Sequence, residues 1–102
     1  MIDHHLDWKE TLLDIFAGYI NQDALGEALE QLAQQNSCDA LHHASTIYAL
    51  DTAIASARTG SDDVLPIVNR SGYYVHSAEQ AVELLTEVRQ MYALEYSKLA
   101  KQ

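Results

Sequence analysis

The chain has 102 residues, of which 48% are hydrophobic and 21% charged, so it has room for one globular domain and is too apolar for a disordered chain. Fifteen acidic residues face six basic ones, and the net charge of −9 argues against direct binding to a nucleic-acid backbone or to an anionic membrane surface. The single cysteine excludes an internal disulfide, which favours a reducing compartment such as the cytoplasm. No apolar run reaches the length of a membrane-spanning helix.

Residues 7–36 predict two short helices. Asp7 can cap the first helix, and Glu10 stands three residues later, which is close to a capping box. The second helix begins at Asn21 or Asp23 and ends within residues 34–36. Apolar residues recur at helical spacing in both segments, which predicts one buried stripe on each helix. The stripes consist of Trp8, Leu12, Leu13, Ile15, Phe16, Tyr19 and Ile20, and of Leu25, Ala28, Leu29 and Leu32.

A longer, alanine-rich helix is predicted from Ser37 to about Arg58. Ser37 suits the N-cap, and the acidic Asp39 suits the first turn, where it interacts favourably with the helix dipole. Arg58 suits the C-terminus for the same electrostatic reason. Gly60 can adopt the left-handed conformation that ends many helices, so we expect the helix to end just before it.

Residues 64–76 are typical of a β-hairpin. Two β-rich runs, 64–68 and 73–76, flank four residues with turn character. Pro66 removes one backbone donor, so its strand should lie at an edge or turn its non-bonding side to the partner strand. A last helix follows from Ser77, with Gln80 at the capping-box position. The expected fold is therefore α+β and mainly helical, with two short N-terminal helices packed on a helix–β-hairpin–helix unit.

Acidic residues concentrate in the N-terminal part of the chain. Residues 1–36 hold seven acids against Lys9 alone, and so carry −6 of the net charge of −9. A second group, Glu79, Glu83 and Glu87, recurs every four residues and forms a row along the last predicted helix. These carboxylates form either a solvated outer face or a recognition surface that attracts a basic partner by electrostatic steering.

Seven residues are candidates for binding a partner. Six of them are acidic residues of the two groups just described, and the seventh is a tyrosine of the predicted hairpin, a residue type favoured at protein interfaces. The candidates are Asp14, Glu27, Glu30, Tyr74, Glu79, Glu83 and Glu87.

Cys38 and His42 are the candidates for metal or catalytic chemistry. They stand four residues apart on a predicted helix and share a face, and thiolate and imidazole are both zinc ligands. Cys38 near a helix N-terminus could also be an activated nucleophile with His42 as its base. A structural zinc site takes four ligands, however, and four glycines cannot supply a phosphate-binding loop or a dinucleotide fingerprint. We therefore expect no cofactor and no enzymatic activity, with metal binding or catalysis through Cys38 and His42 as an alternative.

The segment from Tyr48 to Leu99 resembles two groups of phage proteins. It contains the stretches ALDTAIASARTG and VLPIVNRSGYYVHSAEQAVELLTEV. In its helix–hairpin–helix layout it is similar to the small head–tail joining proteins of long-tailed phages, and in texture to the C-terminal domains of some phage tail-fibre-associated proteins. The resemblance covers about half of the chain and implies a small, non-enzymatic protein of a phage or mobile element, which would act in the host cytoplasm.

Together these observations predict a single domain over residues 1–102, with an acidic helical part, 1–36, and a helix–hairpin–helix part, 37–102. The expected function is non-catalytic protein–protein interaction with a partner that is basic, without direct contact to nucleic acid or membrane. The alternative is an acidic inhibitor that imitates nucleic acid and blocks a basic host protein, such as a defence protein. An exposed strand edge and two long amphipathic helices also favour a homodimer.

Overall fold

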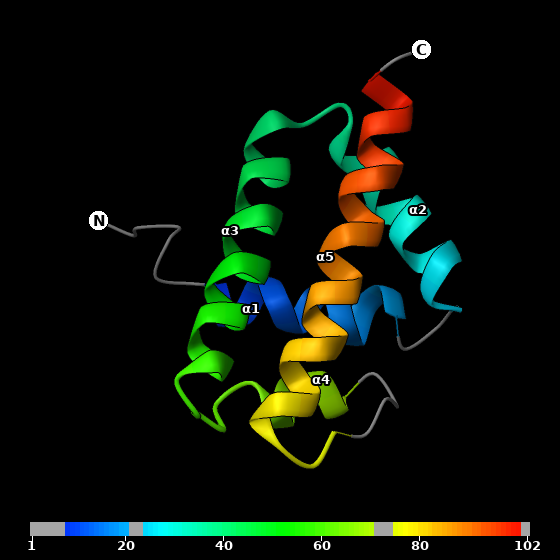
Figure 1. Cartoon of the computed structure of the whole chain (residues 1–102). Coiled ribbons are helices and arrows are strands. Elements are labelled where there is room, and N and C mark those ends of the chain that lie inside the picture. The colour runs from blue at the N-terminus through cyan, green and yellow to red at the C-terminus, as the bar shows by residue number, and fades with distance from the viewer. Residues whose placement is uncertain (1–7, 21–23, 71–74, 101–102) are drawn as a thin grey trace.

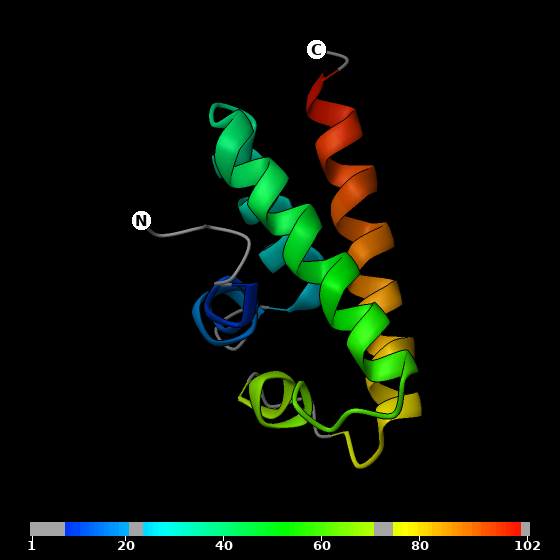
Figure 2. The ribbon, with the colours of Figure 1, turned by 90° about the vertical axis from the view of Figure 1, so that its left-hand side faces the viewer.

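The computed structural model describes residues 8–20, 24–70 and 75–100, and within them it contains helices and no strands. In chain order they are α1 (Trp8–Leu13), the π-helix η2 (Asp14–Ile20), α2 (Leu25–Asn36), α3 (Ala40–Arg58), α4 (Leu65–Asn69) and α5 (Ala78–Ala100). The long helices α3 and α5 run side by side, and α2 packs on another side of α5 (Figure 1). α1 and η2 run across this pair in Figure 1, and in the turned view of Figure 2 they are seen nearly end-on.

One hydrophobic core joins all of these helices. Leu12 and Phe16 of the first two elements are fully buried, as the helical spacing predicts. The largest core side chains come from every element and include Leu12, Phe16, Leu29, Leu50, Val68, Leu85 and Tyr92. None of the described helices combines the length and apolar character that crossing a membrane requires.

The N-terminus of α3 is capped by Asp39, and the predicted cap at Ser37 is wrong. Asp39 has an extended backbone, and its Oδ1 accepts a hydrogen bond from the backbone N–H of His42 at 3.1 Å. Ser37 instead donates from its hydroxyl to the carbonyl of Gln34 at the end of α2, at 2.7 Å. The predicted end of α3 is confirmed, because Gly60 has a φ of 89°.

The predicted β-hairpin is wrong where residues 64–70 and 75–76 are described. Residues Leu65–Asn69 form the short helix α4, and Pro66 lies in its first turn, where a missing N–H costs no helical hydrogen bond. The backbone of Val75 pairs with a side chain instead of a strand, since its N–H donates to Asn69 Oδ1 at 2.8 Å and its carbonyl accepts from Asn69 Nδ2 at 3.3 Å. The expected α+β class is thereby corrected to an all-helical fold, and the strand edge behind the predicted homodimer is lost from these residues.

The start of α5 follows the predicted capping pattern. The backbone N–H of Gln80 donates to Ser77 Oγ at 3.3 Å. The Gln80 side chain returns to accept from the backbone N–H of His76 at 2.7 Å. This reciprocal arrangement differs from a standard capping box only in that the glutamine bonds one residue further upstream. It fixes the N-terminus of the longest helix, which carries Tyr92 of the polar network described below.

Candidate functional site

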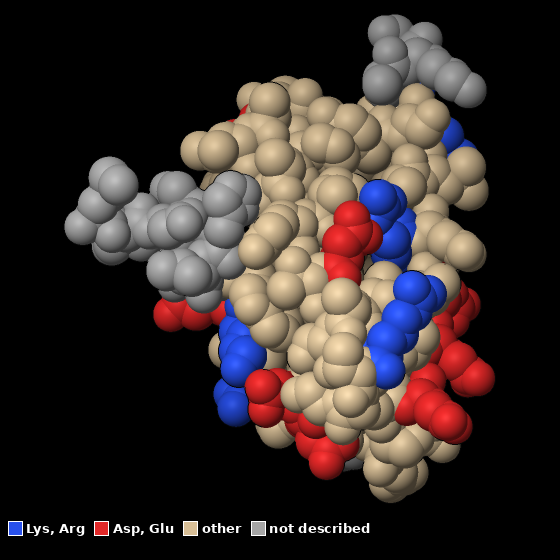
Figure 3. Space-filling model, turned by 60° about the vertical axis from the view of Figure 1, so that its left-hand side comes forward, with Lys and Arg blue, Asp and Glu red and all other residues tan. Residues whose placement is uncertain are grey.

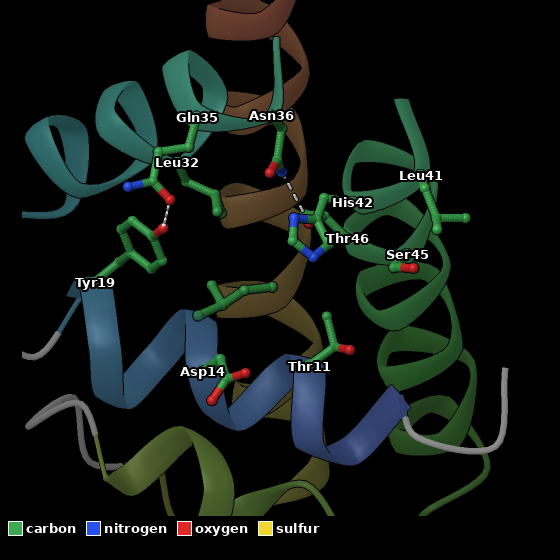
Figure 4. Close-up of a pocket in the computed structure, with 11 residues that line it drawn as sticks. Thr11, Asp14, Tyr19, Leu32, Gln35, Asn36, Leu41, His42, Ser45 and Thr46 are labelled. Carbon is green, nitrogen blue, oxygen red and sulfur yellow. Dashed lines mark hydrogen bonds between the residues drawn. The ribbon is translucent and has the colours of Figure 1, made fainter. Parts of the chain in front are cut away.

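A cleft opens between η2, the C-terminal end of α2 and the N-terminal half of α3 (Figure 4). Its volume is about 270 Å³. That is below the range of about 300–1,000 Å³ typical of sites for drug-sized ligands and cofactors, so the cleft suits a single side chain. Eleven residues line it: Thr11, Asp14, Ile15, Tyr19, Leu32, Gln35, Asn36, Leu41, His42, Ser45 and Thr46.

The base of the cleft is apolar. Ile15 of η2 is 2% exposed and Leu32 of α2 is 5% exposed. Leu41 of α3, at 63%, is among the most exposed large apolar side chains of the described residues. An aliphatic chain entering the cleft would therefore bury apolar surface against these side chains, which is favourable in water.

Asp14 supplies a carboxylate to this cleft. It is the first residue of η2, and it lies beside Thr11 on the helical segment that borders the cavity (Figure 4). Nowhere in the described part of the chain does an ion pair or hydrogen bond engage this carboxylate. The π-helix that begins at Asp14 is a rare form that is frequently found at functional sites. A guest in the cleft would thus meet an exposed carboxylate that makes no hydrogen bond or ion pair with any described residue.

Tyr19 and Gln35 join η2 to α2 across the cleft. The Tyr19 hydroxyl donates to Gln35 Oε1 (Figure 4). This bond leaves the amide N–H groups of Gln35 and a lone pair on the Tyr19 oxygen for other partners. With Thr11 and Ser45, the cleft therefore presents hydroxyl and amide groups from four helical segments.

Behind the cleft lies a buried polar network that joins α2, α3 and α5. Asn36, only 4% exposed, donates through Nδ2 to Thr46 Oγ1 and to the Tyr92 hydroxyl, both at 3.0 Å. The Tyr92 hydroxyl lies 2.7 Å from His43 Nδ1. Within the described part of the chain, no buried side-chain polar atom lacks a hydrogen-bond partner, so this network is complete and fixes the wall of the cleft.

The protonation states of Tyr92 and His43 follow from their surroundings. Burial raises the pKa of Tyr92, an effect that its hydrogen bond from Asn36 partly offsets. Burial also lowers the pKa of His43, and the nearby Arg89 lowers it further. We therefore assign a neutral His43 whose Nδ1 accepts a hydrogen bond from the Tyr92 hydroxyl. Its ring stacks on Tyr96, with the centroids 3.6 Å apart and the planes 9° apart.

Of the predicted partner-binding residues, only Asp14 lines the cleft. Glu27 and Glu30 are exposed on α2, and the acidic row of Glu79, Glu83 and Glu87 is exposed on α5. Tyr74 lies outside the described residues. On the face drawn in Figure 3, acidic side chains gather over the lower part, whereas the upper part is mostly uncharged. The structure therefore separates the predicted residues into Asp14 in a cleft and carboxylates on open helix faces.

The prediction that Cys38 and His42 share a helix face is wrong. Cys38 is exposed in the turn between α2 and α3, outside the helix that carries His42. His42 Nδ1 lies 3.1 Å from Asp39 Oδ2, the carboxylate that caps the helix. Within the described ranges, no group of three or more His, Cys, Asp and Glu side chains could hold a metal ion.

The buried network includes residues that the sequence analysis did not select. Asn36 was expected only as part of the end of a helix. Tyr92 is fully buried on α5. The one sequence signal for such a network is a polar residue at the boundary of two apolar stripes. This signal does not identify the residue with which the polar side chain forms a hydrogen bond.

Comparison with models of protein families, with curated proteins and with solved structures finds no match to this chain. The resemblance to small proteins of tailed phages therefore stays a prediction. The hairpin that formed part of the resembling layout is replaced by α4 in the described residues.

Proposed function

We propose that this protein is a non-catalytic binding module for a basic protein partner. The observation that carries the proposal is the cleft of side-chain size that contains the carboxylate of Asp14, which makes no ion pair or hydrogen bond with any described residue. A positively charged side chain is the complementary guest, because it supplies both an aliphatic stem and a donor group. The type of function is the one predicted from the sequence, but the proposed binding surface is now one cleft.

Net charge supports a basic partner. The chain carries −9, and its six candidate acids are exposed in the structure. Few of the exposed carboxylates are neutralised, since the ion pairs with lysine or arginine in the described residues are Lys9–Asp63, Arg89–Asp51 and Lys98–Glu95. Such an excess attracts positively charged proteins over a distance of about 10 Å at moderate ionic strength and speeds their association.

The proposed compartment and oligomeric state are those expected from the sequence. We propose action in the cytoplasm, because the single cysteine cannot form an internal disulfide. The resemblance to phage proteins would make this the cytoplasm of a bacterial host. A homodimer remains part of the proposal through the long helices α3 and α5, which light scattering at high protein concentration would test.

Selection from a random peptide library tests the proposed function. Peptides displayed on a surface are panned against the immobilised protein and eluted with rising salt. We expect the recovered peptides to be enriched in arginine and lysine and to elute early, because salt screens exposed charges. Recovery of peptides without basic enrichment, or no recovery above an unrelated control protein, contradicts the proposal.

A variant of the acidic row separates this function from nucleic-acid imitation. An imitator needs ordered carboxylates at regular spacing, which Glu79, Glu83 and Glu87 supply on α5. Replacing all three by glutamine should weaken binding of the selected peptides only by reducing net charge. If the triple variant loses binding completely while Asp14→Asn retains it, the row on α5 is the binding surface and the alternative function is favoured.

A further inference from the structure

We propose that the cleft recognises an arginine side chain of the partner in preference to lysine. This inference rests on the proposed function and names the group that enters the cleft. It is argued from the acceptors that line the cleft, from its apolar base and from its size.

The acceptors come from more than one direction. Asp14 offers a carboxylate from η2, and Ser45 offers a hydroxyl from α3. Gln35 Oε1 on α2 already accepts from Tyr19 and has a second lone pair. A guanidinium carries five N–H donors in a planar fork and can bond several acceptors together, whereas a lysine ammonium is a compact charge with three donors. Acceptors spread over three segments therefore favour arginine.

The remaining lining suits the rest of the arginine side chain. Ile15 and Leu32 form the apolar base, on which three methylene groups can lie. The ring of Tyr19 also lines the cleft, and a guanidinium can stack on an aromatic face, which an ammonium does less well. The volume of about 270 Å³ admits one such side chain and leaves little space for a larger ligand.

The charge of the guest is set by Asp14. No other carboxylate is among the residues that line the cleft, and its oxygens are free of partners in the described structure. A charge-assisted hydrogen bond is about twice as strong as a neutral one. Removing the negative charge should therefore weaken the binding of an arginine side chain far more than the binding of an uncharged side chain of the same shape.

Chemical-shift mapping with small probes tests this inference. Acetyl-arginine amide, acetyl-lysine amide and acetyl-citrulline amide are titrated separately into isotope-labelled protein, and amide shifts are followed. Citrulline has nearly the shape of arginine without its charge. We expect saturable shifts at Asp14, Ser45 and the Gln35 side-chain amide with arginine, weaker ones with lysine, and none with citrulline. Equal shifts with lysine and arginine, or arginine shifts that lie only on other surfaces, would overturn the inference.

A matched pair of variants completes the test. Asp14→Asn should reduce arginine binding by about tenfold or more, as loss of a hydrogen bond to a charged group does. Glu10→Gln removes the same charge from an exposed position of α1 that does not line the cleft, and it should leave the shifts in place. Equal losses in the two variants would mean that only general charge attraction operates. In that case this inference fails while the binding of basic peptides, and with it the proposed function, stands.

Discussion

The hydroxyl of Tyr92 lies 2.7 Å from Nδ1 of His43, and this hydrogen bond connects α5 with α3. The same hydroxyl accepts from Asn36 at 3.0 Å, which adds α2 to the pair. Because the three groups are satisfied by one another, the position of each depends on the other two. This network holds the C-terminal end of α2, the first turns of α3 and the C-terminal half of α5 together next to the cleft.

Removing the hydroxyl should destabilise the fold. Tyr92→Phe leaves an N–H of Asn36 and Nδ1 of His43 without their partner, which should lower the free energy of unfolding by about 1–3 kcal/mol. Urea unfolding followed by circular dichroism measures this change. Tyr96→Phe is the matched control, because it keeps the ring stacked on His43, and it should stay within about 0.5 kcal/mol of the unmodified protein. Equal effects in the two variants would contradict the role of the Tyr92 hydroxyl.

Stability should fall in mild acid. The pKa of His43 is lower in the folded protein than its ordinary value of 6.5, so the unfolded chain binds a proton more readily. The contribution of neutral His43 is fully present above about pH 6.5, and it is lost as the pH falls through the lower folded pKa. The free energy of unfolding, measured at a series of pH values, should decrease across this window. His43→Gln should remove that part of the slope, and an unchanged slope in the variant would argue against the assignment.

The turn after α4 should depend on the side chain of Asn69. Asn69→Ala removes both hydrogen bonds to the Val75 backbone and should cost about 1–2 kcal/mol. Asn69→Asp keeps the acceptor for the Val75 N–H but sets a carboxylate oxygen against the Val75 carbonyl oxygen in place of the donor, so it should also destabilise the fold. Arg70→Ala, at an exposed neighbouring position, serves as the control. Thermal or urea unfolding compares the variants, and a loss in Asn69→Ala no larger than in Arg70→Ala would contradict the role of the Asn69 side chain.

Two substitutions at the start of α3 separate the observed cap from the predicted one. Asp39→Ala should lower the free energy of unfolding by about 1 kcal/mol, the usual cost of losing an N-cap side chain. Ser37→Ala removes an exposed hydrogen bond to the end of α2 and should cost less. Unfolding in urea measures both variants. A larger loss at Ser37 than at Asp39 would show that the capping geometry is different.

Most helical segments could be predicted from the sequence, because their apolar stripes and end signals agree. Gly60 and the pair Ser77 and Gln80 act locally, and the structure confirms all three. The prediction of a strand at residues 64–68 was wrong for a physical reason. A β-branched run with one proline also suits a short helix when Pro66 falls in its first turn. The Asn69 side chain bonds the backbone of Val75 in place of a partner strand. Sequence rules for hairpins do not consider such contacts between a side chain and a backbone.

The candidate site could be predicted only in part. Asp14 stood among the acidic candidates because of its charge, whereas its place in a cleft depends on α2 and α3 crossing near η2. Asn36 and Tyr92 are 56 positions apart, and no local pattern indicates that they meet. Charge can therefore be read from composition, but the residues that share a cleft are set by tertiary packing.

Affinity of a selected basic peptide for three forms of the protein tests the central claim most directly. The dissociation constant is measured by fluorescence anisotropy for the unmodified protein, for Asp14→Asn and for Glu10→Gln, at one fixed salt concentration. The account predicts a loss of about tenfold for Asp14→Asn and less than about twofold for Glu10→Gln. Indistinguishable affinities for Asp14→Asn and the unmodified protein would contradict the claim that the cleft holds the partner.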